Sequence, residues 1–297
     1  MKIDFFLLFI FFLHPLLLGQ PEASFSKNKE KILNLTEELN KNLPLKQQGI
    51  LYRDLAEAHY HDQELIRGYK AFLQALQCTS LSHEAPAMCE EEKKIYEEAL
   101  LLYREEGGGN PICLSKKLCD HYALIGEEHP EYIHLNFLLS TAYANLGMYD
   151  RFFKEFYKGY PYFKETSLAC KTQGILLIRL AQTSGLEEER VELRKEGIFK
   201  LERAVELDPN DSSLYKVLIY LAKEDKREAC LIGYLEEVCR RRVKLSREEI
   251  YPYVKEAIFL HQPVLAEDLI DLWQTWYPYS RSIEAARKFL EQTKARG

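Results

Sequence analysis

The 297-residue sequence has no long stretch in which Val, Ile or Thr alternates with polar residues, the pattern typical of half-buried β-strands. This absence indicates an all-α protein. The apolar fraction of 46% and the charged fraction of 29% are ordinary for a folded chain. The formal net charge of −6 gives no electrostatic basis for binding nucleic acid, so we expect no nucleic-acid partner.

Motifs of common enzyme and metal classes are also missing. There is no Cys-x-x-Cys, no His-Glu-x-x-His and no Gly-x-Ser-x-Gly, so neither a zinc site nor a serine nucleophile is indicated. The triplet Gly107-Gly108-Gly109 lacks the Lys-Ser/Thr that follows a phosphate-binding loop, and we interpret it as a turn. We therefore expect no catalytic residue, no cofactor and no metal, and we predict that the chain is not an enzyme.

The seven cysteines are an odd number, so at least one stays unpaired or forms an intermolecular link even in an oxidising compartment. Cys113 and Cys119 lie on nearly opposite faces of one predicted helix and should not pair with each other. We expect most of the seven to be small apolar core residues.

The first residues form a distinct segment. Lys2 precedes an apolar run from Phe5 to Leu18, and Gly19 follows it, which resembles a secretory signal peptide. The run is shorter than the roughly 20 residues that span a bilayer comfortably. We interpret residues 1–19 as a signal peptide or an N-terminal anchor. The expected localisation is exported, either periplasmic or secreted, or alternatively anchored in the inner membrane by residues 5–18. A buried first helix of a cytosolic protein is the third alternative.

Helical periodicity and helix-stop residues divide the remaining chain into about fourteen predicted helices. The predicted helices and hairpins cover 26–40, 45–61, 64–77, 90–106, a helix from Pro111, 131–160, 167–207, 212–224, 227–243, 247–260, 264–275 and 281–294.

Two hairpins share one spacing of small and aromatic residues. The first places Leu55-Ala56 before His59, and then Gly68, Phe72 and Ala75. The second places Leu139-Ser140 before Tyr143, and then Gly147, Phe156 and Gly159. Leu201-x-x-Ala204 and Tyr215-x-x-Leu218 match in part. This pattern of residue types and spacings resembles the tetratricopeptide repeat.

The resemblance implies an all-α fold over residues 24–297, an α-solenoid of stacked antiparallel helical hairpins that forms a right-handed superhelix. Ala56 and Ala142 are expected where neighbouring helices approach closely. Gly147 suits the left-handed residue that ends a helix.

The resemblance also implies that the first helix of each hairpin lines a concave face that binds a protein or peptide. Carried over by position, the partner-binding residues are Ile50, Arg53, Glu57, Tyr60, His134, Phe137, Thr141, Ala144, Ser213, Lys216 and Tyr220. The pairs Arg53/Glu57 and Phe137/Thr141 do not match the Lys/Asn clamp with which some members grip a terminal carboxylate. We therefore expect apolar and aromatic contacts. The alternative is that the rings of Tyr60 and Phe137 only fill helix–helix seams.

The expected function is that of a protein–protein interaction scaffold in the cell envelope, which contacts a membrane only through the N-terminal segment if that is not cleaved. A cytosolic tetratricopeptide-type chaperone for secreted cargo is the alternative, and a repeat-bearing hydrolase is the rival from the enzyme class.

Two local clusters of residues, one basic and one aromatic, lie near the C-terminal end of the sequence. Arg240-Arg241-Arg242 is expected to complement the end of a helix. The aromatic group at 273–279 is expected to fill seams, to cap the stack or to face a partner.

Overall fold

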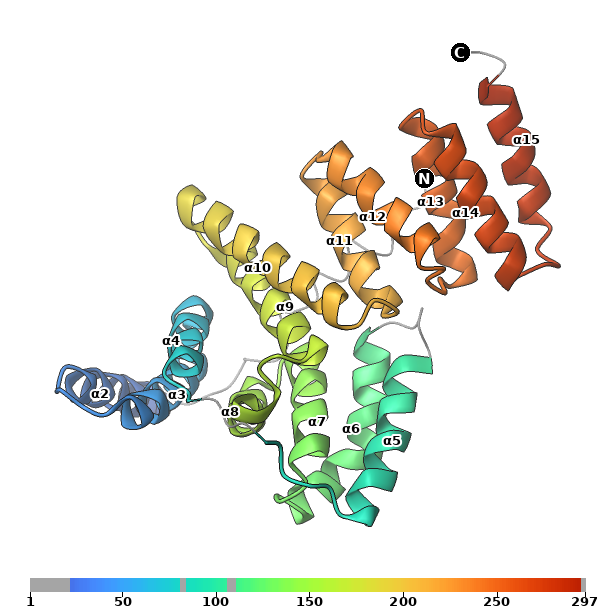
Figure 1. Ribbon diagram of the computed structural model, residues 1–297. Helices are drawn as coiled ribbons and strands as arrows, with labels where there is room; N and C mark the ends of the chain where they lie inside the picture. Colours follow the sequence, from blue (N-terminus) through green and yellow to red (C-terminus); the bar gives the residue numbers. More distant parts are fainter. Residues whose placement is uncertain (1–21, 81–83, 106–110, 295–297) are drawn as a thin grey trace. The chain divides into compact units, whose positions relative to one another are not determined.

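The computed structural model describes residues 22–80, 84–105 and 111–294, and these ranges contain fourteen α-helices and no strand (Figure 1). The prediction of an all-α chain built from helical hairpins is confirmed. The proposed signal segment, residues 1–19, and the glycine triplet at 107–109 lie outside the described residues. The chain divides into two compact units. Unit 1 comprises residues up to Ala99 together with Pro111–Lys164, and unit 2 comprises Leu100–Asn110 together with the residues from Glu165 onward.

Seven helices begin in unit 1. They are α2 (Glu22–Leu39), α3 (Leu45–His61), α4 (Leu65–Gln77), α5 (Glu90–Glu105), α6 (Pro111–Glu128), α7 (Ile133–Leu146) and α8 (Tyr149–Phe163). The last residues of α5, from Leu100, belong to unit 2.

Seven helices make up the rest of unit 2. They are α9 (Ser167–Thr183), α10 (Glu187–Leu207), α11 (Ser212–Glu224), α12 (Glu228–Arg240), α13 (Arg247–Phe259), α14 (Pro263–Trp276) and α15 (Ser282–Lys294). The helix predicted over 227–243 ends at Arg240, and the others agree with the prediction to within a few residues.

One turn recurs at the reversal of four hairpins, α3–α4, α7–α8, α11–α12 and α13–α14. In each, a single residue after the first helix has a positive φ, namely Gln63 (63°), Gly147 (74°), Lys226 (54°) and His261 (55°). The left-handed residue turns the chain so that the next amide donates back to a carbonyl of the preceding helical turn, as in the Schellman motif. These bonds run from Glu64 to His59, Met148 to Tyr143, Arg227 to Ala222 and Gln262 to Ala257, and their lengths are 2.8–2.9 Å.

The residue that follows the left-handed position is also alike in the four hairpins. Its φ lies between −84° and −108° and its ψ between 63° and 76° at Glu64, Met148, Arg227 and Gln262. The second helix then starts at once. Only one of the four left-handed positions is a glycine, which is why the sequence predicted a left-handed residue at Gly147 and only a helix break at the other three.

An aromatic seam joins the hairpin α3–α4 to α8 inside unit 1. Phe72 of α4 is fully buried, and its ring centroid lies 4.7 Å from that of Phe153, 5.1 Å from that of Phe152 and 6.0 Å from that of Phe156. Tyr69 continues the seam with an edge-on contact of 5.2 Å to Tyr149. Aromatic rings bury about 150–250 Å² each, so these six side chains supply much of the apolar burial between the helices.

Close helix approach depends on the small residues that the sequence predicted. Ala56 and Ala142 are both fully buried, as expected. A Cβ on Gly68 of α4 would stand 3.1 Å from the Ala56 carbonyl oxygen, so α3 and α4 cross almost backbone to backbone. In unit 2, α9 and α10 cross in the same way at Gly174 and Gly197.

The two units order their hairpins differently. In unit 1, α3 and α4 pack on α8, although α5, α6 and α7 intervene in the chain, and α7 packs on α6 as well as on α8. In unit 2, α11 to α15 pack on one another in chain order, from orange to red in Figure 1. Their shared core includes the fully buried side chains of Leu235, Val254, Leu269 and Trp273. Chain-order stacking, which a solenoid requires, is therefore found in unit 2, while unit 1 departs from it.

The turn leads to a stability prediction. Replacing Gln63, Lys226 or His261 with Gly should stabilise the chain by roughly 0.5–1 kcal/mol each, because Gly removes the clash between Cβ and a carbonyl oxygen at positive φ. Gly147→Ala should cost about 1–2 kcal/mol for the same reason. Chemical denaturation of each variant measures these changes.

Gly185→Ala is the matched control, because a Cβ there would meet nothing within 4 Å and its φ is not in the left-handed region. Destabilisation by the three Gly substitutions would contradict the shared turn geometry.

Candidate functional site

The predicted partner positions on α3 lie partly in a seam. The Arg53 guanidinium stands 5.6 Å from the centre of the Tyr157 ring on α8 and pairs with Asp54 at 2.6 Å. The Tyr60 hydroxyl donates to the Gly147 carbonyl oxygen at 3.0 Å, and its ring is 5.2 Å from that of Tyr149. These contacts support the alternative interpretation of Tyr60 as a seam residue.

The other two predicted positions on α3 are more open. Ile50 is 38% exposed, and Glu57 is partly exposed, with its carboxylate 3.9 Å from His61. The four positions on α3 therefore do not form one free face, because α8 packs on two of them.

The predicted positions on α7 are buried. Phe137 is 3% exposed, Thr141 4% and Ala144 6%. The Phe137 ring stacks on Phe156 at 4.8 Å, and the Thr141 hydroxyl donates to the Leu138 carbonyl oxygen. A partner lying in a groove cannot reach these three side chains, so the prediction of an open face on α7 is wrong.

Packing on several sides explains this burial. All ten residues from Leu135 to Ala144 are buried, and helices α6 and α8 both pack on α7. His134, the fourth predicted position, lies just before this stretch, and its backbone amide donates to the buried Glu92 carboxylate of α5 at 3.0 Å. α7 is thus buried along most of its length, so its predicted positions do not form an exposed face.

The predicted positions on α11 have a different environment, since Ser213, Lys216 and Tyr220 are all partly exposed. They precede the left-handed Lys226 by thirteen, ten and six residues, the spacing at which Ile50, Arg53 and Glu57 precede Gln63. The same spacing assigns Lys223 as a fourth position of α11, which the sequence motif alone does not indicate.

The hairpin α13–α14 repeats the turn but was not recognised in the sequence as a repeat. Counting back from His261 assigns Glu248, Tyr251, Lys255 and Ile258 to the corresponding positions of α13. Ile258 is buried, and Tyr251 and Lys255 are partly exposed, with the Lys255 ammonium 4.5 Å from the centre of the Tyr251 ring. Pro263, the first residue of α14, was the one available signal for this turn.

Two ion pairs join α11 to α13. The Lys216 ammonium lies 2.6 Å from Glu249, and Lys223 pairs with Glu256. The partners stand 33 residues apart in both pairs, which is close to the length of one helical-hairpin repeat. The first helices of two consecutive hairpins therefore lie side by side in unit 2.

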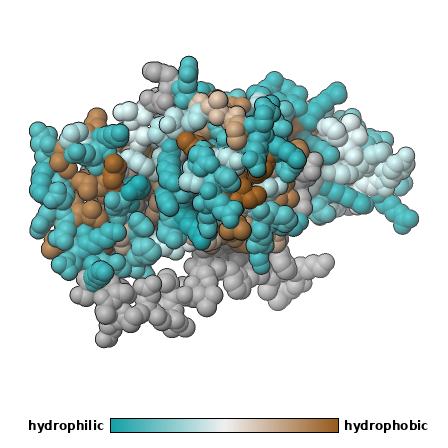
Figure 2. Space-filling view, turned by 90° about the horizontal axis from the view of Figure 1, so that it is seen from below, coloured by the Kyte–Doolittle hydropathy of each residue, from teal (hydrophilic) through white to brown (hydrophobic). Residues whose placement is uncertain are grey.

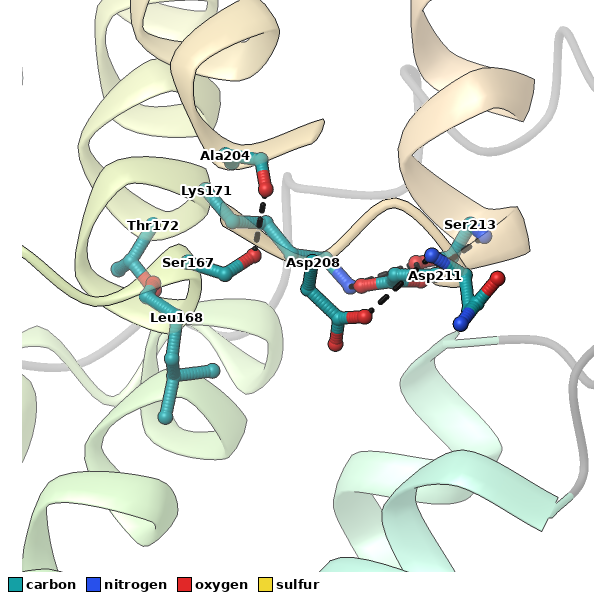
Figure 3. A network of polar contacts seen from close by, with 9 residues as sticks. Ser167, Leu168, Lys171, Thr172, Ala204, Asp208, Asp211 and Ser213 are labelled. Atoms are coloured by element: carbon teal, nitrogen blue, oxygen red, sulfur yellow. Dashed lines mark hydrogen bonds and ion pairs between the residues drawn. The ribbon is translucent and has the colours of Figure 1, made fainter. Parts of the chain in front are cut away.

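A buried polar network fixes the start of α11 against α9 (Figure 3). The Lys171 ammonium is 2.8 Å from Asp211 and donates to the Ser213 hydroxyl at 2.5 Å. Asp211 in turn caps α11 by accepting from the Ser213 amide at 2.9 Å. The ring centre of Tyr103, in the part of α5 that belongs to unit 2, lies 5.4 Å from the same ammonium.

The charges of this network stabilise each other. Burial alone would lower the pKa of Lys171, but the nearby Tyr103 and Asp211 outweigh it and raise that pKa. Burial would likewise raise the pKa of Asp211, but Lys171 and the hydrogen bonds from Ser213 outweigh it and lower that pKa. The pair is therefore ionised in the fold and sets the position of Ser213.

The basic cluster behaves as predicted. Arg240 lies in the last turn of α12, and both Arg240 and Arg241 pair with Glu237. Hydrogen bonds from Arg240, together with Arg241 and against partial burial, lower the pKa of Glu237 to about 2. Arg240 and Arg242 also line a groove of about 460 Å³ between α12 and α14, together with Glu236, Cys239, Asp268, Asp271, Leu272 and Thr275. The lining carries both signs of charge.

The aromatic group at 273–279 divides between core and surface. Trp273 is 1% exposed, whereas Trp276 and Tyr279 are 37% and 96% exposed. On the face drawn in Figure 2, hydrophobic side chains reach the surface as separate patches among hydrophilic ones. The largest exposed apolar side chains of unit 2 also include Phe199 of α10 and Phe259 of α13.

The seven cysteines all lie in the described ranges and are free thiols. Only Cys170 is buried, while Cys89 and Cys113 are exposed, so the expectation that most of them fill the core is wrong.

Among the described residues, no three His, Cys, Asp or Glu side chains gather closely enough to hold a metal ion. None of the described helices combines the length and the apolar character needed to cross a bilayer. No protein-family model and no curated protein matches the chain.

The network at α11 leads to a pH prediction. Asp211→Asn should destabilise the chain by about 2–3 kcal/mol at neutral pH, because it leaves the Lys171 ammonium buried without a counter-charge. Since the folded pKa of Asp211 is lowered, its stabilisation is present above the unfolded value of about 3.9 and is lost as the pH falls through the folded value. The difference between wild type and variant should therefore shrink below about pH 4.

Urea denaturation from pH 7 down to pH 3 measures this effect, with the exposed Asp268→Asn as control. A stability difference that is constant across this range would show that the carboxylate does not act through its charge.

Proposed function

We propose that this chain is a protein–protein interaction scaffold, and that a partner protein or peptide binds across α11 and α13 of unit 2. The observation that carries the proposal is the partial exposure of Ser213, Lys216 and Tyr220 on a helix joined directly to the next first helix. Stacked hairpins present such a face once per repeat, and extended concave surfaces of this kind bind partners in solenoid proteins.

The proposal includes a tetratricopeptide-like relationship. It is supported by the four equivalent turns, by the chain-order stacking of α11 to α15 and by the ion pairs 33 residues apart. The right-handed superhelix belongs to this proposal. No catalysis is assigned to the chain.

We place the proposed partner site in unit 2 because most of the corresponding positions in unit 1 are packed against other helices. Burial of Phe137 and the seam contacts of Tyr60 leave little of the originally predicted surface available. Tyr220 is the partly exposed aromatic residue on α11, and aromatic side chains are frequent energetic anchors of interfaces.

A photo-crosslinking experiment tests the site. A benzophenone amino acid at position 220 should capture a partner in the native compartment, and Tyr220→Ala should weaken binding of that partner by more than about 2 kcal/mol. The same probe at Phe199, which is 64% exposed on α10, serves as the control. Equal capture from both positions, or capture from Ile50 but not from position 220, would contradict the placement on α11.

We also propose that the chain is exported and acts in the cell envelope, with the apolar run from Phe5 to Leu18 as the signal or anchor. Replacing Leu8 and Phe9 with Arg should block translocation, because it interrupts the apolar run. Cell fractionation and N-terminal sequencing of the purified protein measure this effect. A mature protein that retains Met1 in the cytosolic fraction would favour the chaperone alternative over the envelope scaffold.

A further inference from the structure

The exposed face of α11 carries a short stripe of two cations and one aromatic ring. Lys216, Tyr220 and Lys223 follow one another at steps of four and three residues, which places them on one side of the helix. The two lysines are seven residues apart, so their attachment points are separated by about 10 Å along the helix axis. We refer to these three residues as the α11 stripe.

The carboxylates that pair with the lysines lie deeper than the lysines do. The Lys216 side chain is 25% exposed and that of Glu249 12%, while Lys223 is 61% exposed and Glu256 20%. In these two ion pairs the ammonium groups therefore form the outer layer and the carboxylates form the inner layer. An ammonium group has three N–H donors, so the pair with Glu256 does not exhaust the hydrogen-bonding capacity of Lys223.

The neighbouring helix adds a further cation on the same side of the hairpins. Lys255 holds the position of α13 that corresponds to Tyr220 of α11, and its ammonium lies over the Tyr251 ring. Since the whole chain has a formal net charge of −6, this cationic layer is a local feature and not a general property of the surface.

We propose that the α11 stripe binds an acidic segment of the partner. This inference rests on the proposed function and adds the chemistry of recognition. Two carboxylates about 10 Å apart, such as those seven residues apart on a partner helix, match the spacing of Lys216 and Lys223. An apolar side chain between them packs on the ring of Tyr220. Recognition is therefore charge-assisted, in contrast to the mainly apolar contacts expected from the sequence.

Three fluorescent peptides with blocked ends test the proposal. The first is an alanine-based helix with two glutamates seven residues apart, the second is its isomer with the glutamates five residues apart on opposite faces, and the third has glutamine in their place. Fluorescence anisotropy with the purified full chain should show about tenfold tighter binding of the first peptide than of the other two. The preference should decrease as salt is added, because exposed ion pairs are screened.

Variants of the chain separate recognition from structure. Lys216→Gln with Lys223→Gln should abolish the preference, whereas Lys195→Gln with Lys288→Gln, which removes two exposed lysines elsewhere, should keep it. Glu249→Gln with Glu256→Gln removes the inner carboxylates but keeps the stripe, so this variant should bind the first peptide more tightly than the wild type does. Thermal melting by circular dichroism compares the folding of all three variants.

The results divide into distinct outcomes. Equal binding of the three peptides, no binding of any of them, or weaker binding of the first peptide by Glu249→Gln with Glu256→Gln would overturn the acidic recognition. If a partner is still captured from position 220 in those cases, the proposed function stands and only the partner chemistry is rejected. Failure of that capture rejects the proposed function itself.

Discussion

Four hairpin reversals depend on one residue at positive φ, which lets the next backbone amide donate a hydrogen bond to the helix that has just ended. The same geometry occurs after α3, α7, α11 and α13, with bonds of 2.8–2.9 Å closing each turn. Because two or three backbone groups are satisfied within the turn, the reversal needs no loop and the second helix begins immediately. The turn also fixes which positions of the first helix correspond between hairpins, and the comparison of candidate sites in the two units rests on that correspondence.

Hairpins with the same turn pack differently in the two units of this chain. In unit 1, rings from α4 and α8 close a seam around Phe72, and α7 is buried along ten consecutive residues. In unit 2, the first helices α11 and α13 are joined by partly exposed lysine–glutamate pairs. Apolar burial dominates the stability of the first arrangement, whereas the second leaves charged and aromatic side chains accessible to a partner. Under the proposed function, unit 1 has a structural role and unit 2 binds the partner.

Much of the fold could be predicted from sequence, because helix periodicity and stop residues are local signals. Gly147 marked its turn, and Ala56 marked a close helix contact. Helix breaks were predicted around Lys226 and His261, but the left-handed residues themselves were not, because a non-glycine residue holds that position in both turns. Burial of Phe137 could not be predicted either. It depends on how α6 and α8 pack on α7, a tertiary arrangement that the sequence of one helix does not reveal. The ion pairs between α11 and α13 depend on register across a repeat, which a single hairpin does not reveal.

We propose that the partner contacts the first helices of unit 2, because the equivalent positions on α7 of unit 1, including Phe137, are buried. Hydroxyl-radical footprinting of the chain, free and with its captured partner, tests this claim directly, since the rate of oxidation follows the exposure of each aromatic ring. The account predicts that Tyr220 is oxidised in the free chain and protected by the partner, and that Phe137 stays unreactive in both states. Oxidation of Phe137 in the free chain, or protection confined to Ile50 and Glu57 on α3, would contradict it.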